Sequence, residues 1–218
     1  MESWAEKYRP ESLSDIIGNT KVINDLKTWA KSWGDKMVKK GVILSGPPGC
    51  GKTSAAIALA NDMEWEVIEL NASDARSGAV IEGTALRAGL FQTFGRKGLA
   101  DRNLILLDEA DNLYERAKQS KNKTKNYSDR GGKRAITKTL EQTRQPVVIT
   151  VNDLYNLTKG TGSKIKRLCL NLKFQRPSVI SIATVLQNIC EKEGLEISNE
   201  SIRAMAENVK GDLRGAIN

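Results

Sequence analysis

The sequence contains no histidine, which excludes Ser-His and Cys-His catalysis and metal binding through imidazole. It has few cysteines, widely spaced at Cys50, Cys169 and Cys190, which indicates neither a disulfide framework nor a zinc site. No apolar run approaches the roughly 20 residues of a membrane helix, and the charged segment Met1–Pro10 lacks a signal-peptide core. We therefore expect a reducing, intracellular compartment and catalysis that depends on carboxylates, lysine, arginine and bound metal.

The composition is that of a folded, basic protein. Of the 218 residues, 39% are hydrophobic and 28% are charged, without the apolar depletion of disordered chains. The net charge of +8 is compatible with a polyanionic partner such as nucleic acid, and equally with a solvated basic surface. The length allows one ordinary domain and a small second one.

Apolar segments that predict strands alternate with helical patterns along most of the sequence. The predicted strands are Val42–Leu44, Val67–Leu70, Leu104–Leu107 and Val147–Val151, and a further apolar alternation runs from Leu168 to Phe174. The stretches between them are long enough for helical crossovers. The sequence therefore predicts an α/β fold with a parallel sheet flanked by helices.

After Pro177 the strand signals stop, and apolar residues recur at helical spacing. We expect an α/β domain over residues 1–177 and a small all-α domain over residues 178–218. A third helix would open at Gly211-Asp212, yet only about one turn follows. We expect the helical domain to be truncated and the chain to be a fragment of a longer polypeptide.

A glycine-rich loop between a predicted strand and a predicted helix is the strongest motif. Gly46-Pro47-Pro48-Gly49-Cys50-Gly51-Lys52-Thr53 matches the P-loop pattern in its required context. The glycines allow backbone N–H groups to face phosphates, Lys52 reaches the β- and γ-phosphates, and the Thr53 hydroxyl would bind magnesium. The loop predicts ATP and Mg²⁺ as ligands; the alternative is a turn that only joins strand to helix.

An acidic segment follows the predicted strand Leu104–Leu107, where a parallel sheet presents its ligand edge. Asp108 is the candidate magnesium ligand, and Glu109 can polarise an attacking water as general base. Asp111 is also compatible with the start of the next helix. The alternative for the pair is that both carboxylates only cap that helix.

A third polar group, Asn152, follows the predicted strand Val147–Val151. It can orient the same water or contact the γ-phosphate. Alone it would be weak evidence, because asparagine after a strand is often a turn residue. The two other sites favour the functional interpretation.

These three strand ends, followed by a small helical domain, resemble AAA+ ATPases and particularly the clamp-loader branch. Four segments resemble replication factor C subunits: Trp4–Pro10, Gly46–Gly49, Asn71–Asp74 and Gly211–Arg214. The resemblance covers essentially the whole chain. It implies an ATPase that loads a sliding clamp onto primer–template DNA during replication, with small clamp-loader subunits as partners and a cytoplasmic, nucleoid-associated location.

The resemblance also implies residue roles around ATP. In that family the Tyr-Arg-Pro segment lies over the adenine, and the arginine matching Arg214 is carried by the helical domain onto the phosphates. The implied ATP-binding set is Tyr8, Arg9, Pro10, Ile17, Gly46, Pro47, Pro48, Gly49, Cys50, Gly51, Lys52, Thr53, Ser54, Asn152 and Arg214.

One departure narrows the resemblance. Small clamp-loader subunits carry Ser-Arg-Cys before the last strand, whereas this chain has Arg167-Leu168-Cys169. Together with Asp129-Arg130-Gly131-Gly132 and the absence of an N-terminal extension, this resembles the large subunit of the archaeal form. The resemblance implies that the chain receives an arginine finger rather than supplying one. Hydrolysis in isolation should then be slow, since a finger in trans is worth about 10³ to 10⁵ in rate.

Two further contact regions follow from the resemblance. Basic residues would face DNA phosphates in the central chamber: Arg76, Arg87, Arg130 and Lys133. The last two belong to the basic low-complexity stretch Lys118–Arg134, which we expect to be a mobile loop. Leu90, Phe91 and Phe94 would anchor the sliding clamp. The alternatives are a solvated basic surface and core residues of the ATPase domain, respectively.

Three other functions compete with this interpretation. Asp108-Glu109-Ala110-Asp111 spells the letters that name one helicase group, but those proteins need a second large ATPase-like domain. An initiator or branch-migration AAA+ ATPase is a closer relative, against which the Tyr8-Arg9-Pro10 and Asn71–Asp74 segments argue. An ATP-binding scaffold without turnover is the non-enzymatic alternative, and the intact Glu109 argues against it.

Overall fold

A parallel sheet forms the centre of the computed structural model, which describes residues 3–33, 39–71, 102–111 and 132–218. Within these residues the strands are β1 (Gly41–Ser45), β2 (Glu66–Asn71), β3 (Asn103–Asp108), β4 (Val147–Val151) and β5 (Cys169–Lys173). They lie in the order β2-β3-β4-β1-β5, and every neighbouring pair is parallel. The predicted α/β fold is confirmed.

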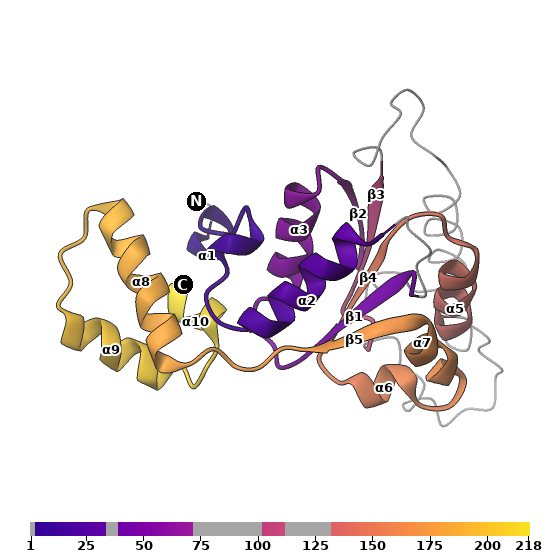
Figure 1. Ribbon diagram of the computed structural model, residues 1–218. Helices are drawn as coiled ribbons and strands as arrows, with labels where there is room; N and C mark the ends of the chain where they lie inside the picture. The colour runs from indigo at the N-terminus through magenta and orange to yellow at the C-terminus, as the bar shows by residue number, and fades with distance from the viewer. Residues whose placement is uncertain (1–2, 34–38, 72–101, 112–131) are drawn as a thin grey trace.

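Helices cover both faces of the sheet (Figure 1). One face carries α2 (Thr20–Lys31) and α3 (Lys52–Asp62); the other carries α5 (Gly132–Gln142), α6 (Leu154–Thr158), the 3₁₀ turn η3 (Gly160–Gly162) and α7 (Ser163–Leu168). Successive strand residues alternate between two apolar clusters, so Val42 and Leu44 pack in one and Ile43 in the other. This two-sided burial explains why the strands of a covered parallel sheet are apolar at nearly every position.

The edge strand β5 differs in detail from the prediction. The expected alternation begins at Leu168, but Leu168 closes α7 and the strand starts at Cys169. Cys169 is fully buried in the cluster of the second face, whereas Leu172 and Phe174 belong to the first. Both sides of β5 therefore carry buried residues, because helices cover both faces of the sheet.

A separate group of helices follows the sheet. It consists of α8 (Val179–Glu193), α9 (Asn199–Asn208) and the short α10 (Leu213–Ile217), which lie together at one end of the molecule (Figure 1). Their own core contains Ile182, Leu186, Cys190, Ile202 and Ala206. The boundary predicted at residue 177 falls in the connection between β5 and α8, and we keep it as a proposal.

The N-terminal segment lies between these helices and the sheet. Its elements are α1 (Trp4–Lys7) and the 3₁₀ turn η1 (Leu13–Asp15) (Figure 1). The backbone N–H of Ala5 donates to Oδ1 of Asn218 at 3.2 Å, which joins α1 to the end of α10. Further along, Asn19 pairs twice with the backbone of Gln175, donating through Nδ2 at 3.1 Å and accepting through Oδ1 at 2.8 Å. The chain between β5 and α8 is thereby fixed to the start of α2.

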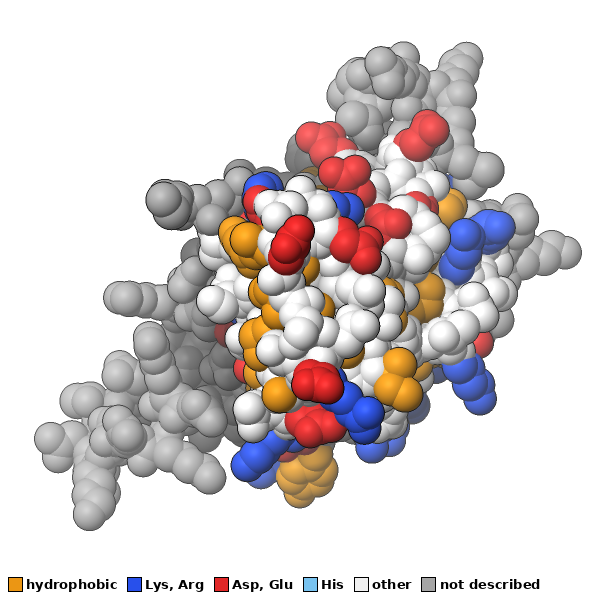
Figure 2. Space-filling view, turned by 90° about the vertical axis from the view of Figure 1, so that its left-hand side faces the viewer, with side chains coloured by type: hydrophobic (Ala, Val, Ile, Leu, Met, Phe, Trp, Pro, Cys, Tyr) orange, Lys and Arg blue, Asp and Glu red, His pale blue; other side chains and the backbone are white. Residues whose placement is uncertain are grey.

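The outer surface of the helical group is mixed in character. Figure 2 shows this side: acidic side chains gather toward one end, and apolar side chains form small separate areas among polar ones. Ile180, 78% exposed, is the most accessible of the large apolar residues in the described part of the chain. In that same part, none of the helices combines the length and apolar character that a membrane crossing needs.

Candidate functional site

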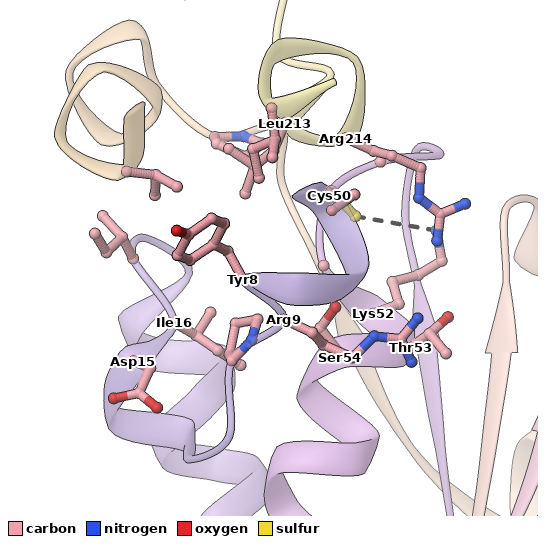
Figure 3. Close-up of a pocket in the computed structure, with 18 of the residues that line it drawn as sticks. Tyr8, Arg9, Asp15, Ile16, Cys50, Lys52, Thr53, Ser54, Leu213 and Arg214 are labelled. Atoms are coloured by element: carbon pink, nitrogen blue, oxygen red, sulfur yellow. Dashed lines mark hydrogen bonds between the residues drawn. The ribbon is translucent and has the colours of Figure 1, made fainter. Parts of the chain in front are cut away.

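The carboxyl ends of β3, β4 and β1, which are neighbours in the sheet, border one cleft of about 740 Å³. The sheet side of the cleft contains Lys52, Thr53, Asp108, Glu109 and Asn152. The N-terminal segment and helices α8 and α10 form the opposite side, as Figure 3 shows for Tyr8, Leu213 and Arg214. Ligands of open α/β sheets bind outside this edge.

The loop from β1 to α3 needs glycine at its turns. Gly46 has φ 156° and Gly49 has φ 71°, backbone conformations that side chains disfavour. A Cβ at Gly46 would lie 2.6 Å from the carbonyl oxygen of Phe174, and one at Gly49 would lie 2.1 Å from Oδ1 of Asp212. The absence of these side chains lets the chain after β5 and the start of α10 approach the loop closely.

Lys52, the first residue of α3, is held at the centre of this loop. Its Nζ donates to the carbonyl oxygens of Gly46 and Pro47, both at 2.8 Å, and to Oδ1 of Asn152 at 3.0 Å. The side chain is 8% exposed. Burial lowers the pKa of the ammonium below its ordinary 10.5, and the nearby thiol and carboxylates oppose this shift. The cation is thus surrounded by oxygen acceptors, which phosphate oxygens can replace.

Three oxygen-bearing side chains meet at the ends of β3 and β4. Oδ1 of Asp108 accepts hydrogen bonds from the hydroxyls of Thr53, at 3.0 Å, and Thr150. Hydroxyl and carboxylate oxygens are the ligands that Mg²⁺ prefers, and Thr53 and Asp108 are already in contact. These residues therefore fit the metal that a P-loop ATPase uses.

Two features of the backbone after β3 determine the orientation of Glu109. Its φ is 51°, in the left-handed region that is uncommon for residues other than glycine. Its backbone N–H donates to Oγ1 of Thr150 at 3.1 Å. The side chain is exposed at the cleft, where a general base must meet water.

Asp111 fixes the end of β4 rather than binding in the cleft. Its Oδ2 accepts from the backbone N–H groups of Asn152, at 3.0 Å, and Asp153, at 2.9 Å. The residue is 7% exposed. The carboxylate thereby holds the backbone from which the Asn152 side chain reaches Lys52. The sequence pattern indicates only a helix start at Asp111 and does not reveal this contact.

On the side of the cleft opposite the sheet, the N-terminal segment contacts α8. The Tyr8 hydroxyl donates to Oε1 of Glu193 at 2.6 Å, and Lys7 Nζ lies 2.5 Å from the same oxygen. Apolar side chains of α8 and α10 line the same cleft: Val185, Ile189, Leu213 and Ile217. A tyrosine ring and aliphatic groups form the kind of surface on which an aromatic base packs.

Most of the predicted ATP-binding residues lie in this one cleft. Those that line it are Tyr8, Arg9, Pro10, Ile17, Pro48, Gly49, Cys50, Gly51, Lys52, Thr53, Ser54, Asn152 and Arg214. Gly46 and Pro47 do not line it, although both bind Lys52 through their carbonyl oxygens. Thr150 and the apolar wall residues Val185, Ile189, Leu213 and Ile217 were not predicted. A signal for Thr150 was present, since it is the polar residue in an otherwise aliphatic strand.

The predicted DNA contact at Lys133 disagrees with the structure. Lys133 is 5% exposed, and its Nζ donates to the carbonyl oxygens of Asn156, at 2.7 Å, and Lys159, at 2.9 Å. Burial lowers the pKa of this ammonium to about 8, and Lys159 acts in the same direction. In this position Lys133 connects α5 to the turn after α6 and does not face a phosphate. The other predicted contacts, Arg76, Arg87, Leu90, Phe91, Phe94 and Arg130, lie outside the described residues.

The contact of Glu193 with Lys7 and Tyr8 predicts a pH dependence. Hydrogen bonds from Lys7, followed by those from Tyr8, lower the pKa of Glu193 below its ordinary 4.5. The contact should thus be complete above that value and be lost as the pH falls through the lowered pKa. Thermal unfolding across the carboxyl range should show wild type more stable than Glu193→Gln at neutral pH, with the difference vanishing in acid. Glu191→Gln, on the same helix, is the control; an equal loss there would contradict the assignment.

A P-loop, an acidic strand end and a polar strand end around one cleft, with a group of helices beside it, define an ATPase of the AAA class. The family model described as "ATPase family associated with various cellular activities (AAA)" matches residues 42–184. The chain belongs to this family.

Within this family, the chain is similar to one kind of subunit. The chain is 46% identical over 216 residues to the replication factor C large subunit of Methanosarcina mazei, covering 99% of this chain and 32% of the relative. It is 43% identical over 227 residues to the replication factor C large subunit of Halorubrum lacusprofundi, covering 100% of this chain and 42% of the relative. The predicted resemblance to archaeal large subunits is confirmed. The chain spans about a third to two fifths of the length of these relatives.

Solved structures show the same fold. The RuvB Holliday junction branch migration motor of Thermotoga maritima aligns with a TM-score of 0.70 at 18% identity, covering 96% of this chain and 62% of that one. At this identity the likeness concerns the fold alone.

Proposed function

We propose that this chain is the ATPase part of a clamp-loader large subunit, which uses ATP to place a sliding clamp on primer–template DNA. The observation that carries the proposal is the convergence of Lys52, Thr53, Asp108 and Asn152 in one cleft. The names of the curated relatives supply the biological setting. The chain would comprise an ATPase domain at residues 1–177 and a lid at residues 178–218.

Each cleft residue has a role in phosphoanhydride hydrolysis. Lys52 would exchange its carbonyl partners for the β- and γ-phosphates. Thr53 and Asp108 would hold Mg²⁺, which would supply charge neutralisation. Glu109 accepts a proton from the attacking water. Asn152, now bound to Lys52, contacts the γ-phosphate and so distinguishes ATP from ADP.

The position of the lid would depend on which nucleotide is bound. Arg214 is the second residue of α10, and Asp212, which caps this helix, lies against Gly49 of the loop. Its side chain lines the cleft together with the loop (Figure 3). An arginine in this position binds the phosphates of one nucleotide state better than those of the other. That difference in affinity is what a ligand needs to shift the angle of a domain.

Leu168 supports the role of a subunit that receives an arginine finger. The residue is half-buried and packs against the cluster of the second sheet face. A neighbouring subunit would complete the site of this chain. We propose small clamp-loader subunits, a sliding clamp and primed DNA as partners. Arg76, Arg87 and Arg130 are kept as proposed DNA contacts, and Leu90, Phe91 and Phe94 as proposed clamp contacts.

The test is ATP hydrolysis by the full-length polypeptide mixed with its small subunits, with and without clamp and primed DNA. Stimulation by clamp and DNA together is the expected result. Turnover by the polypeptide alone at an unstimulated, unchanging rate would indicate a different AAA ATPase. Nucleotide binding without turnover under every condition would indicate a scaffold.

A further inference from the structure

Thr150 is a buried hydroxyl in the centre of the sheet. It is the fourth residue of β4, is 1% exposed, and is surrounded in sequence by aliphatic strand residues. The strand lies between β3 and β1, so Thr150 sits between the acidic strand end and the P-loop strand. It also borders the nucleotide cleft.

One hydroxyl makes hydrogen bonds to two consecutive residues, the last residue of β3 and the residue that follows it. Oγ1 of Thr150 donates to Oδ1 of Asp108 and accepts from the backbone N–H of Glu109, at 3.1 Å. A hydroxyl has one proton to donate and lone pairs to accept, so both bonds can form at once. The backbone of Thr150 contributes a third hydrogen bond to this region, because its carbonyl oxygen accepts from the N–H of Ala110 at 3.0 Å.

These bonds fix two groups whose orientation matters for hydrolysis. Because Thr53 donates to the same Oδ1 at 3.0 Å, the carboxylate of Asp108 is held between two hydroxyls, one from α3 and one from β4. The bond to the Glu109 amide holds a backbone with φ 51°, a conformation that glutamate rarely adopts unaided. The direction of the Glu109 side chain depends on that backbone.

We propose that Thr150 is a positioning residue for ATP hydrolysis: its hydroxyl sets the Asp108 carboxylate and the Glu109 backbone relative to the P-loop. The proposal rests on the proposed ATPase function. Outer partners of metal-binding groups are generally worth about 10- to 100-fold in metal affinity or activity.

The test compares three variants of the full-length polypeptide, assayed with its small subunits. Thr150→Val keeps the shape and removes the hydroxyl, and Thr150→Ser keeps the hydroxyl and removes a methyl group. Thr139→Val is the matched control, because Thr139 is a buried threonine of α5 whose Oγ1 has no hydrogen-bond partner within the described chain. Besides kcat and KM, the binding of fluorescent ADP is measured with and without Mg²⁺.

For Thr150→Val we expect a kcat about 10- to 100-fold lower, an unchanged affinity for ADP without Mg²⁺, and a magnesium dependence shifted to higher concentration. Thr150→Ser should recover most of kcat, and Thr139→Val should match wild type. Wild-type kcat and magnesium dependence in Thr150→Val would overturn the proposal. So would equal impairment in Thr150→Ser, because packing rather than the hydroxyl would then be responsible.

The design separates this proposal from the ATPase function on which it rests. A wild-type rate no higher than that of Lys52→Ala would overturn both. A Lys52-dependent rate that Thr150→Val leaves intact would overturn the role of Thr150 alone. Should Thr150→Val fail to bind ADP even without Mg²⁺, Thr150→Ser decides: full kcat supports the proposal, and loss of kcat overturns it.

Discussion

Replacing Lys52 by alanine is expected to lower ATP hydrolysis by about 10² to 10³, the usual cost of removing one preorganised donor from developing negative charge. The ammonium lies among the carbonyl oxygens of Gly46 and Pro47 and the amide of Asn152, directly in the P-loop. Without it the loop keeps its backbone donors but loses the cation that we propose to bind the outer phosphates. Phosphate release measures the effect on hydrolysis, and the binding of a fluorescent nucleotide measures the effect on affinity.

The Lys52 variant should remain folded. Burial lowers the pKa of this ammonium below its ordinary value, which means that its surroundings disfavour the charge. Circular dichroism and the unfolding midpoint without nucleotide should therefore remain close to wild type. Lys27→Ala, at an exposed position of α2, is the control and should hydrolyse ATP normally. Normal hydrolysis by Lys52→Ala would refute the assignment of the cleft.

Replacing Glu109 by glutamine should separate binding from chemistry. The amide keeps the size of the side chain and cannot accept the proton of water, so hydrolysis should drop by about 10² to 10⁴, the usual contribution of a general base. Nucleotide affinity should change little, because these hydrogen bonds of Lys52 and Thr53 go to groups other than the Glu109 side chain. Single-turnover hydrolysis and equilibrium binding, measured on the same preparation, give both quantities.

A matched carboxylate is available for the Glu109 experiment. Glu66 is exposed at the first residue of β2, whereas the cleft lies at the carboxyl edge of the sheet. Glu66→Gln should leave hydrolysis unchanged. If Glu109→Gln hydrolyses ATP like wild type, another group must activate the water, and Glu109 is not the general base.

The parts of the site that local sequence predicts are those whose geometry is local. A P-loop is a strand, a turn and a helix in succession, so its residues indicate both structure and ligand, and the ends of β3 and β4 follow from the edge rule of parallel sheets. Asp111 and Thr150 were not predicted in their roles because their partners lie 41 or 42 positions away. Such pairing depends on strand order, which alternation of apolar residues does not fix.

For Lys133 the sequence predicts a contact at the surface, whereas the structure shows a buried side chain. In the sequence it belongs to a basic stretch, where charge indicates a solvated or DNA-facing surface. In the structure Gly132 and Lys133, the first two residues of α5, are buried, and the carbonyl oxygens of Asn156 and Lys159 accept hydrogen bonds from the Lys133 ammonium. A lysine with a long apolar stem can enter the interior when its ammonium finds acceptors there. Composition cannot reveal those acceptors.

The hydrogen bond between Ala5 and Asn218 brings opposite ends of the described chain together at the lid side of the cleft. A bound nucleotide would touch the N-terminal segment, the P-loop and the lid at once, and it would stabilise all three by mass action. The nucleotide would then link these three segments to one another. Local unfolding of α1 and of α10 would then be coupled, because release of one ligand would loosen both.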